Sequence, residues 1–251
     1  MKRHLAPFLI LCFCLTTNAS AQTVVDVVER PANNVTNTNY VTFRAPLQQV
    51  PLTKLPVGKI QPKGWLRKYL ELQKNGLNGQ LGTISAWLDK NNNQWLSNGG
   101  DHGWEEVPYW IRGYISLAYI LGDNAMKYEA NTWIRAVLSN QSSNGMLGPD
   151  GYDGNSPDLW AKMPMLWAMQ TYYEGTGDKR VLTAMEKYFL WELTIPDDQF
   201  LKGLWQEKRG GDNLWSVLWA YNRTGNESIL PLVDKLHRNT SNWAMKGGLP
   251  N

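Results

Sequence analysis

The sequence Tyr172-Tyr173-Glu174-Gly175-Thr176-Gly177-Asp178 decides the fold, because it joins two stretches whose apolar residues follow helical spacing. Similar stretches, each an aromatic helix followed by a glycine turn, occupy residues 118–123 and 220–226. Their glycines at positions 122, 177 and 225 recur at roughly 50 residues, and another helical stretch follows each turn. Glycine accepts the left-handed conformation that ends a helix, so the repeat predicts stacked αα-hairpins.

Helical spacing also covers most of the chain around these turns, whereas the alternation typical of strands is nearly absent. Before the helices, residues 22–57 contain repeated prolines and Val-Thr-Asn-rich stretches, which predict an extended or irregular segment. We therefore expect an all-α domain over residues 58–251. The predicted helices span residues 65–73, 109–121, 125–138, 159–173, 180–193, 214–221 and 229–243.

The first 21 residues have the three regions of a secretory signal peptide. Lys2 and Arg3 precede an apolar run over residues 6–15, and Ala19-Ser20-Ala21 supplies small residues before the expected cleavage site. The apolar run is shorter than the roughly 20 residues that a membrane span needs. We expect a secreted or periplasmic protein that has no membrane anchor after cleavage.

Composition narrows the classes of function. The chain has 13 Trp residues, which suit helix packing and stacking on sugar faces. Its formal net charge of +3 includes two leader cations, so the mature chain is close to neutral and no nucleic-acid partner is expected. Cys12 and Cys14 both lie in the leader, which excludes thiolate catalysis and Cys-ligated zinc for the mature residues. The Asp and His residues lack tight ligand spacing, so neither a metal nor a cofactor is expected.

Long polar and aromatic loops precede the first helix of each predicted hairpin, at residues 99–110, 148–160 and 205–215, whereas the opposite turns are short. Loops that gather at one end of successive hairpins give the assembly one functional rim. This favours an (α/α)6 barrel or toroid, with its pocket at the inner-helix N-termini, over an open solenoid. The chain has too few predicted helices to close six hairpins, so we expect an incomplete ring that exposes apolar helix faces.

Three acidic residues in these loops are candidate catalytic groups. Glu105 and Glu106 follow Trp104, and glycoside cleavage needs one protonated and one ionised carboxyl group. The alternative is that they favour the first turn of a helix through its dipole. Asp212 follows Arg209-Gly210-Gly211, an arrangement that suits hydroxyl or carboxylate recognition, but it is also placed to cap a helix.

The remaining candidates are polar and aromatic residues that would bind a saccharide. Aromatic rings stack on sugars, and the cations and amides bind hydroxyl or carboxylate groups. The predicted substrate-binding residues are His102, Trp104, Tyr109, Trp160, Lys162, Arg209 and Asn213.

Three sets of residues, in order, resemble the amino-terminal part of the catalytic barrel of the β-L-arabinofuranosidase-type glycoside hydrolases. The resemblance covers roughly residues 59–251. It implies an (α/α)6 barrel, export, and cleavage of plant-type glycans, commonly those that bear arabinose. The sets are Gly64-Trp65-Leu66-Arg67 with Leu72-Gln73 and Gly76-Leu77-Asn78-Gly79, then Trp104-Glu105-Glu106-Val107-Pro108-Tyr109-Trp110, and Gly211-Asp212-Asn213-Leu214-Trp215.

The resemblance also implies a cysteine nucleophile beside a zinc ion that is held by cysteines and a glutamate, in later barrel helices. The expected mature chain has no cysteine. Either that machinery follows Asn251, and the chain is truncated and inactive alone, or the chemistry differs.

Two alternatives remain open. A barrel enzyme that removes unsaturated uronic acids would use Lys162 and Arg209 on the substrate carboxylate. A non-catalytic glycan-binding α-helical repeat protein would need the aromatic rim but no acid.

Overall fold

The structure, a computed structural model, describes residues 27, 29, 43–49, 52–96 and 100–243. The predicted leader, residues 1–21, lies outside the described residues. The described part of the chain is all-α with almost no strand, as predicted. Its α-helices are α1 (Gly64–Asn75), α2 (Leu77–Ile84), α3 (Glu106–Leu121), α4 (Asn124–Ser139), α5 (Lys162–Thr176), α6 (Lys179–Thr194), α7 (Leu204–Thr224) and α8 (Pro231–Asn239).

Short elements connect these helices. The 3-10 helices are η1 (Ala86–Leu88), η2 (Lys90–Asn92) and η3 (Glu227–Ile229). A small antiparallel hairpin, β1 (Tyr152–Asp153) and β2 (Ser156–Pro157), pairs Tyr152 with Pro157 before α5 begins.

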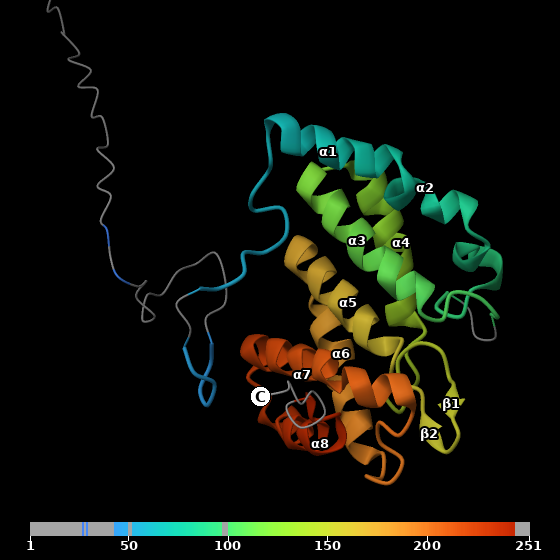
Figure 1. The fold of residues 1–251 in the computed structure, drawn as a ribbon, viewed down its shortest axis with the longest axis vertical. Coiled ribbons are helices and arrows are strands. Elements are labelled where there is room, and N and C mark those ends of the chain that lie inside the picture. Colours follow the sequence, from blue (N-terminus) through green and yellow to red (C-terminus); the bar gives the residue numbers. More distant parts are fainter. Residues whose placement is uncertain (1–26, 28, 30–42, 50–51, 97–99, 244–251) are drawn as a thin grey trace, which may run out of the picture.

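Three helical hairpins stack in two layers, as Figure 1 shows. The helices α3, α5 and α7 pack side by side in one layer, which we call the inner layer, and α4, α6 and α8 form the second layer. Because the hairpins are stacked, the inner helices all begin at one end of the molecule, which we call the rim. The described helices form an open row that runs from α1 to α8, and a closed ring is not shown.

The three glycine turns have the predicted geometry. Gly122, Gly177 and Gly225 end α3, α5 and α7 with φ values of 71°, 72° and 70°, in the left-handed region. The residue after each glycine caps the next helix, because its side-chain oxygen accepts a backbone N–H bond. The donors are Met126 N to Asp123, Arg180 N to Asp178, and Ser228 N to Asn226.

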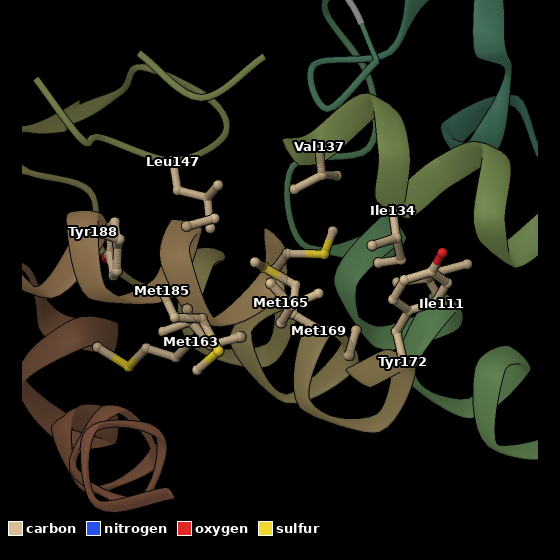
Figure 2. Close-up of a cluster of buried hydrophobic side chains, with 14 of the residues drawn as sticks. Ile111, Ile134, Val137, Leu147, Met163, Met165, Met169, Tyr172, Met185 and Tyr188 are labelled. Atoms are coloured by element: carbon tan, nitrogen blue, oxygen red, sulfur yellow. The ribbon is translucent and has the colours of Figure 1, made fainter. Parts of the chain in front are cut away.

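The core lies between the two layers and is rich in methionine. Met163, Met165 and Met169 of α5 are fully buried beside Met185 of α6, as Figure 2 shows. Flexible, unbranched side chains fill the irregular spaces that differently angled helices leave between them. This buried apolar surface fixes the inner helices against the second layer.

Two helical segments were not predicted. Residues 204–213 were expected to be loop, but they form the first turns of α7. The Gly210-Gly211 pair has low helix propensity, but tertiary packing stabilises the helix here. The helix packs so closely at Gly210 that a Cβ atom there would lie 2.7 Å from Thr240 Oγ1. The helix α2 was missed because Gly79 and Gly82 interrupt its apolar pattern.

Large apolar side chains on α1 and α2 are exposed. Trp65 is 79% exposed, and Leu72, Leu77 and Ile84 are also exposed. No described helix combines the length and apolar character that crossing a bilayer requires.

The irregular residues 43–49 and 52–57 run past the ends of the inner helices that are opposite the rim. Arg44 N donates to Asn222 Oδ1 over 2.8 Å, and the Tyr221 hydroxyl donates to Ala45 O. Lys54 Nζ lies 3.0 Å from Glu174 Oε2. These contacts bring Lys54 onto the face of the inner layer.

Candidate functional site

Glu105 lies at the N-terminal boundary of α3, but its side chain does not cap that helix. Instead, Glu105 Oε2 accepts a bond of 2.7 Å from Trp160 Nε1, which comes from the segment just before α5. Only 4% of Trp160 is exposed. The bond therefore joins the beginnings of two inner helices through a carboxylate that keeps free lone pairs.

A third inner helix reaches the same indole ring. The guanidinium carbon of Arg209, on α7, lies 5.1 Å from the Trp160 ring centroid, within cation–π distance. The Tyr109 ring, on α3, lies 6.0 Å from the same ring. Burial raises the pKa of Tyr109, Arg209 opposes the shift, and the nearby Glu105 and Asp212 carboxylates add to it. We call Glu105, Tyr109, Trp160, Arg209 and Asp212 the rim cluster.

Asp212 faces a cavity of about 380 Å³ on the inner layer. Burial raises its pKa, and the positive charges of Arg209 and Arg112 oppose that shift. A carboxyl group with a raised pKa holds its proton to higher pH, which suits a general acid. The cavity is lined by Lys54, Arg112, Trp167, Gln170, Thr171, Gly211, Asp212 and Trp215.

Asp212 and Asn213 do not cap a helix, because both lie inside α7. Asn213 points away from the cavity and is fully buried, with Nδ2 donating to Glu192 Oε1 and Oε2 over 2.7 and 2.9 Å. Burial raises the pKa of Glu192 to about 7, although Asn213 lowers it. Asn213 is therefore enclosed in the described structure and does not line the cavity beside Asp212.

Lys162 is also buried, with 2% of its surface exposed. Its Nζ donates to Pro149 O over 2.7 Å and to Asp158 O over 2.6 Å. Burial lowers its pKa to about 8, although nearby carboxylates raise it. Lys162 therefore ties the loop before α5 to the start of that helix instead of lining the cavity.

Glu106 lies in the first turn of α3, where the helix dipole favours a carboxylate. Its Oε2 atom is buried and has no hydrogen-bond partner among the described residues. His102 lies earlier in the loop. Its backbone pairs with Asn92 and Gln94, and its ring centroid lies 5.1 Å from that of Trp87. Neither residue lines the cavity beside Asp212.

Trp104 is held by Asp158, which lies in the segment just before α5. Trp104 Nε1 donates to Asp158 Oδ2, and Trp160 N donates to Asp158 Oδ1 over 2.9 Å. Asp158 thus orients both tryptophans and does not cap α5, which begins at Lys162.

Sequence reasoning missed several residues of this site. The Arg112 guanidinium carbon lies 4.2 Å from the Trp167 ring centroid, and Trp167 Nε1 donates to Asp212 O over 3.2 Å. Helical spacing in the sequence points to two of these residues. Arg112 follows Tyr109 by about one helical turn, and Trp215 follows Asp212 by about one turn. Each pair therefore lies on one helix face. No such spacing points to Lys54, because it lies in a segment that is far from the inner helices in the sequence.

The zinc and thiolate set that the resemblance implies does not fit the described residues. They contain no group of three or more His, Cys, Asp or Glu side chains placed to hold a metal ion. Both cysteines lie outside them. We therefore derive no chemical step through zinc from this part of the chain.

Comparison with known proteins bears out the resemblance. The family described as beta-L-arabinofuranosidase, GH127 catalytic domain, matches residues 20–245, which is most of the chain. No match was found among curated proteins or among solved structures. A match over this much of the chain is sufficient to assign the family. The chain therefore belongs to the GH127 β-L-arabinofuranosidase catalytic-domain family.

Proposed function

We propose that this chain forms the sugar-binding face of an exported glycoside hydrolase that acts on arabinose-bearing, plant-type glycans. One observation carries the proposal: the rim cluster brings two carboxylates, two aromatic rings and a guanidinium together from the start of α3, from α7 and from the segment just before α5. Family membership supports a carbohydrate substrate. Export rests on the signal-peptide pattern of residues 1–21.

The two carboxylates suit different tasks. The Trp160 N–H bond orients Glu105, whose remaining lone pairs accept sugar hydroxyl groups. Asp212 has the raised pKa and faces the cavity, so it is the group that would deliver a proton to a departing glycosidic oxygen. Arg209 and Tyr109 would bind the ring hydroxyls between them.

The test is to measure arabinoside hydrolysis and arabinose binding for Glu105→Gln and Asp212→Asn, with Asp234→Asn as the control. Asp234 is exposed on α8, away from the inner layer. We expect Asp212→Asn to lower kcat by at least about 100-fold, the usual contribution of a general acid, while arabinose still binds. We expect Glu105→Gln to weaken binding. Unchanged kinetics and binding in both variants would refute the proposal.

A second function has a specific observation in its favour. Three cations, Lys54, Arg112 and Arg209, surround Asp212, and such a group suits a substrate carboxylate. An unsaturated uronyl hydrolase would need them. Arg209→Ala should then abolish turnover of unsaturated uronides, whereas neutral arabinosides should tolerate the substitution better.

A further inference from the structure

A second cavity lies across Trp160 from the rim cluster. Its volume is about 200 Å³, and four aromatic side chains line it together with two polar ones. The size suits a single sugar ring. The lining residues are Trp104, Tyr152, Asp158, Trp160, Trp205 and Gln206.

The aromatic walls of this cavity are open to solvent. Tyr152 is 67% exposed on the β1–β2 hairpin, and Trp205 is 58% exposed in the first turn of α7. Exposed large aromatics at a cavity mouth are costly to leave in water, and their faces match the apolar faces of sugar rings. Nothing in the rim cluster requires either residue.

A buried glutamine holds the walls of the cavity in place. Gln206 Oε1 accepts from Leu159 N over 3.0 Å, and Gln206 Nε2 donates to Ser156 Oγ over 2.9 Å. These bonds fix the hairpin that carries Tyr152 against the helix that carries Trp205. A cavity whose walls are already ordered binds a ligand at a lower entropic cost.

Asp158 supplies the polar contact. Each of its oxygens accepts one N–H bond, from Trp104 and from Trp160, and each has a further lone pair for a hydroxyl donor. Aromatic platforms with an oriented carboxylate between them recognise a neutral sugar through its faces and its hydroxyls.

We infer that this cavity binds a second sugar ring of the same glycan, next to the ring held by the rim cluster. Trp160 is the shared wall, since it contacts Glu105 and Arg209 and also lines this cavity. The inference rests on the proposed function for the identity of the first ring. Its consequence is that the protein prefers oligosaccharides to single sugars.

The test is calorimetric titration of the full chain with arabinose, arabinotetraose and xylotetraose. We expect Trp205→Ala to raise the Kd for at least one tetrasaccharide about fivefold to tenfold, the value of one aromatic stacking contact, and to leave the Kd for arabinose unchanged. Tyr152→Ala should act in the same direction. The matched control is Trp65→Ala, an exposed tryptophan on α1 outside both cavities, which should change neither value.

Three results would overturn the inference: no tetrasaccharide binding by the unaltered chain, a tetrasaccharide Kd that Trp205→Ala leaves unchanged, or an equal loss for arabinose and tetrasaccharide. Failure of the proposed function would give a different set of binding results. Arabinose binding that survives both Glu105→Gln and Arg209→Ala would remove the rim cluster from the account, while a selective effect of Trp205→Ala on tetrasaccharide would still support the second subsite.

Discussion

The two ends of the inner helices are built in different ways. At the glycine turns, the contacts that end one helix and begin the next are local: a left-handed glycine ends the first helix, and the next residue caps the following one. At the rim, the important contacts join residues far apart in the sequence, such as Trp160 to Glu105 and Leu159 to Gln206. The turns therefore determine how the hairpins stack, whereas the rim depends on that stacking and is where a site can form.

The largest effect is expected at the rim. Gln206→Leu should lower the free energy of unfolding by about 3 kcal/mol, because it leaves Leu159 N–H and Ser156 Oγ without their buried partner. Chemical denaturation measures the loss. The control is Gln80→Leu on the exposed surface of α2, for which we expect a change within about 0.5 kcal/mol. Equal effects of the two substitutions would show that long-range bonds do not hold the rim.

The next effect depends on pH. Glu192 titrates at about 7 in the folded protein against 4.5 as its ordinary value, so between these pH values the folded state holds a proton that the unfolded state has released. Its contribution to stability is therefore greatest below pH 4.5 and falls as the pH rises to 7, by about 3 kcal/mol. Glu192→Gln should remove most of this fall in denaturation curves recorded from pH 4.5 to 7.5. A variant with the same pH slope as the parent would contradict the assignment.

Substitutions at the glycine turns should change the free energy of unfolding least. Comparing alanine at Gly177 with alanine at Gly211 tests whether backbone conformation is the reason. Gly177→Ala should cost about 1 kcal/mol, since its φ of 72° is unfavourable for a residue with a Cβ atom. Gly211 lies inside α7, and an added Cβ has open space at both positions. Gly211→Ala should therefore stabilise the protein by up to about 1 kcal/mol. Changes of the same sign in both variants would show that backbone conformation is not the deciding factor.

This contrast also explains how much could be predicted. The helix order, the glycine turns and the all-α class follow from periodicity and local turn chemistry, which one sequence contains. The start of α7 was missed because the helix packs closely on Leu201 and Thr240 at Gly210, and these contacts cannot be read from the local sequence. Lys162 and Asn213 were expected to bind substrate, but their contacts are with Pro149 O and Glu192, which no local pattern reveals.

The candidate site was predicted in part. Loop aromatics and acids were expected to meet at one rim, and Glu105, Tyr109, Trp160, Arg209 and Asp212 do lie together there. The pairing of Glu105 with Trp160 was not predicted, because it depends on the relative rotation of α3 and the segment before α5. Residues on the open inner face, such as Arg112 and Trp167, were missed because their exposure depends on which helix faces remain uncovered.

An NMR titration tests directly whether the rim cluster binds a sugar. The indole N–H signals of the tryptophans are recorded by NMR during titration with arabinose, and the Trp160 signal is assigned with Trp160→Phe. We expect the Trp160 signal to shift on titration, because its Nε1 donates to Glu105, and the shift to disappear in Glu105→Gln. A titration that shifts other tryptophan signals and leaves Trp160 unmoved would contradict the account.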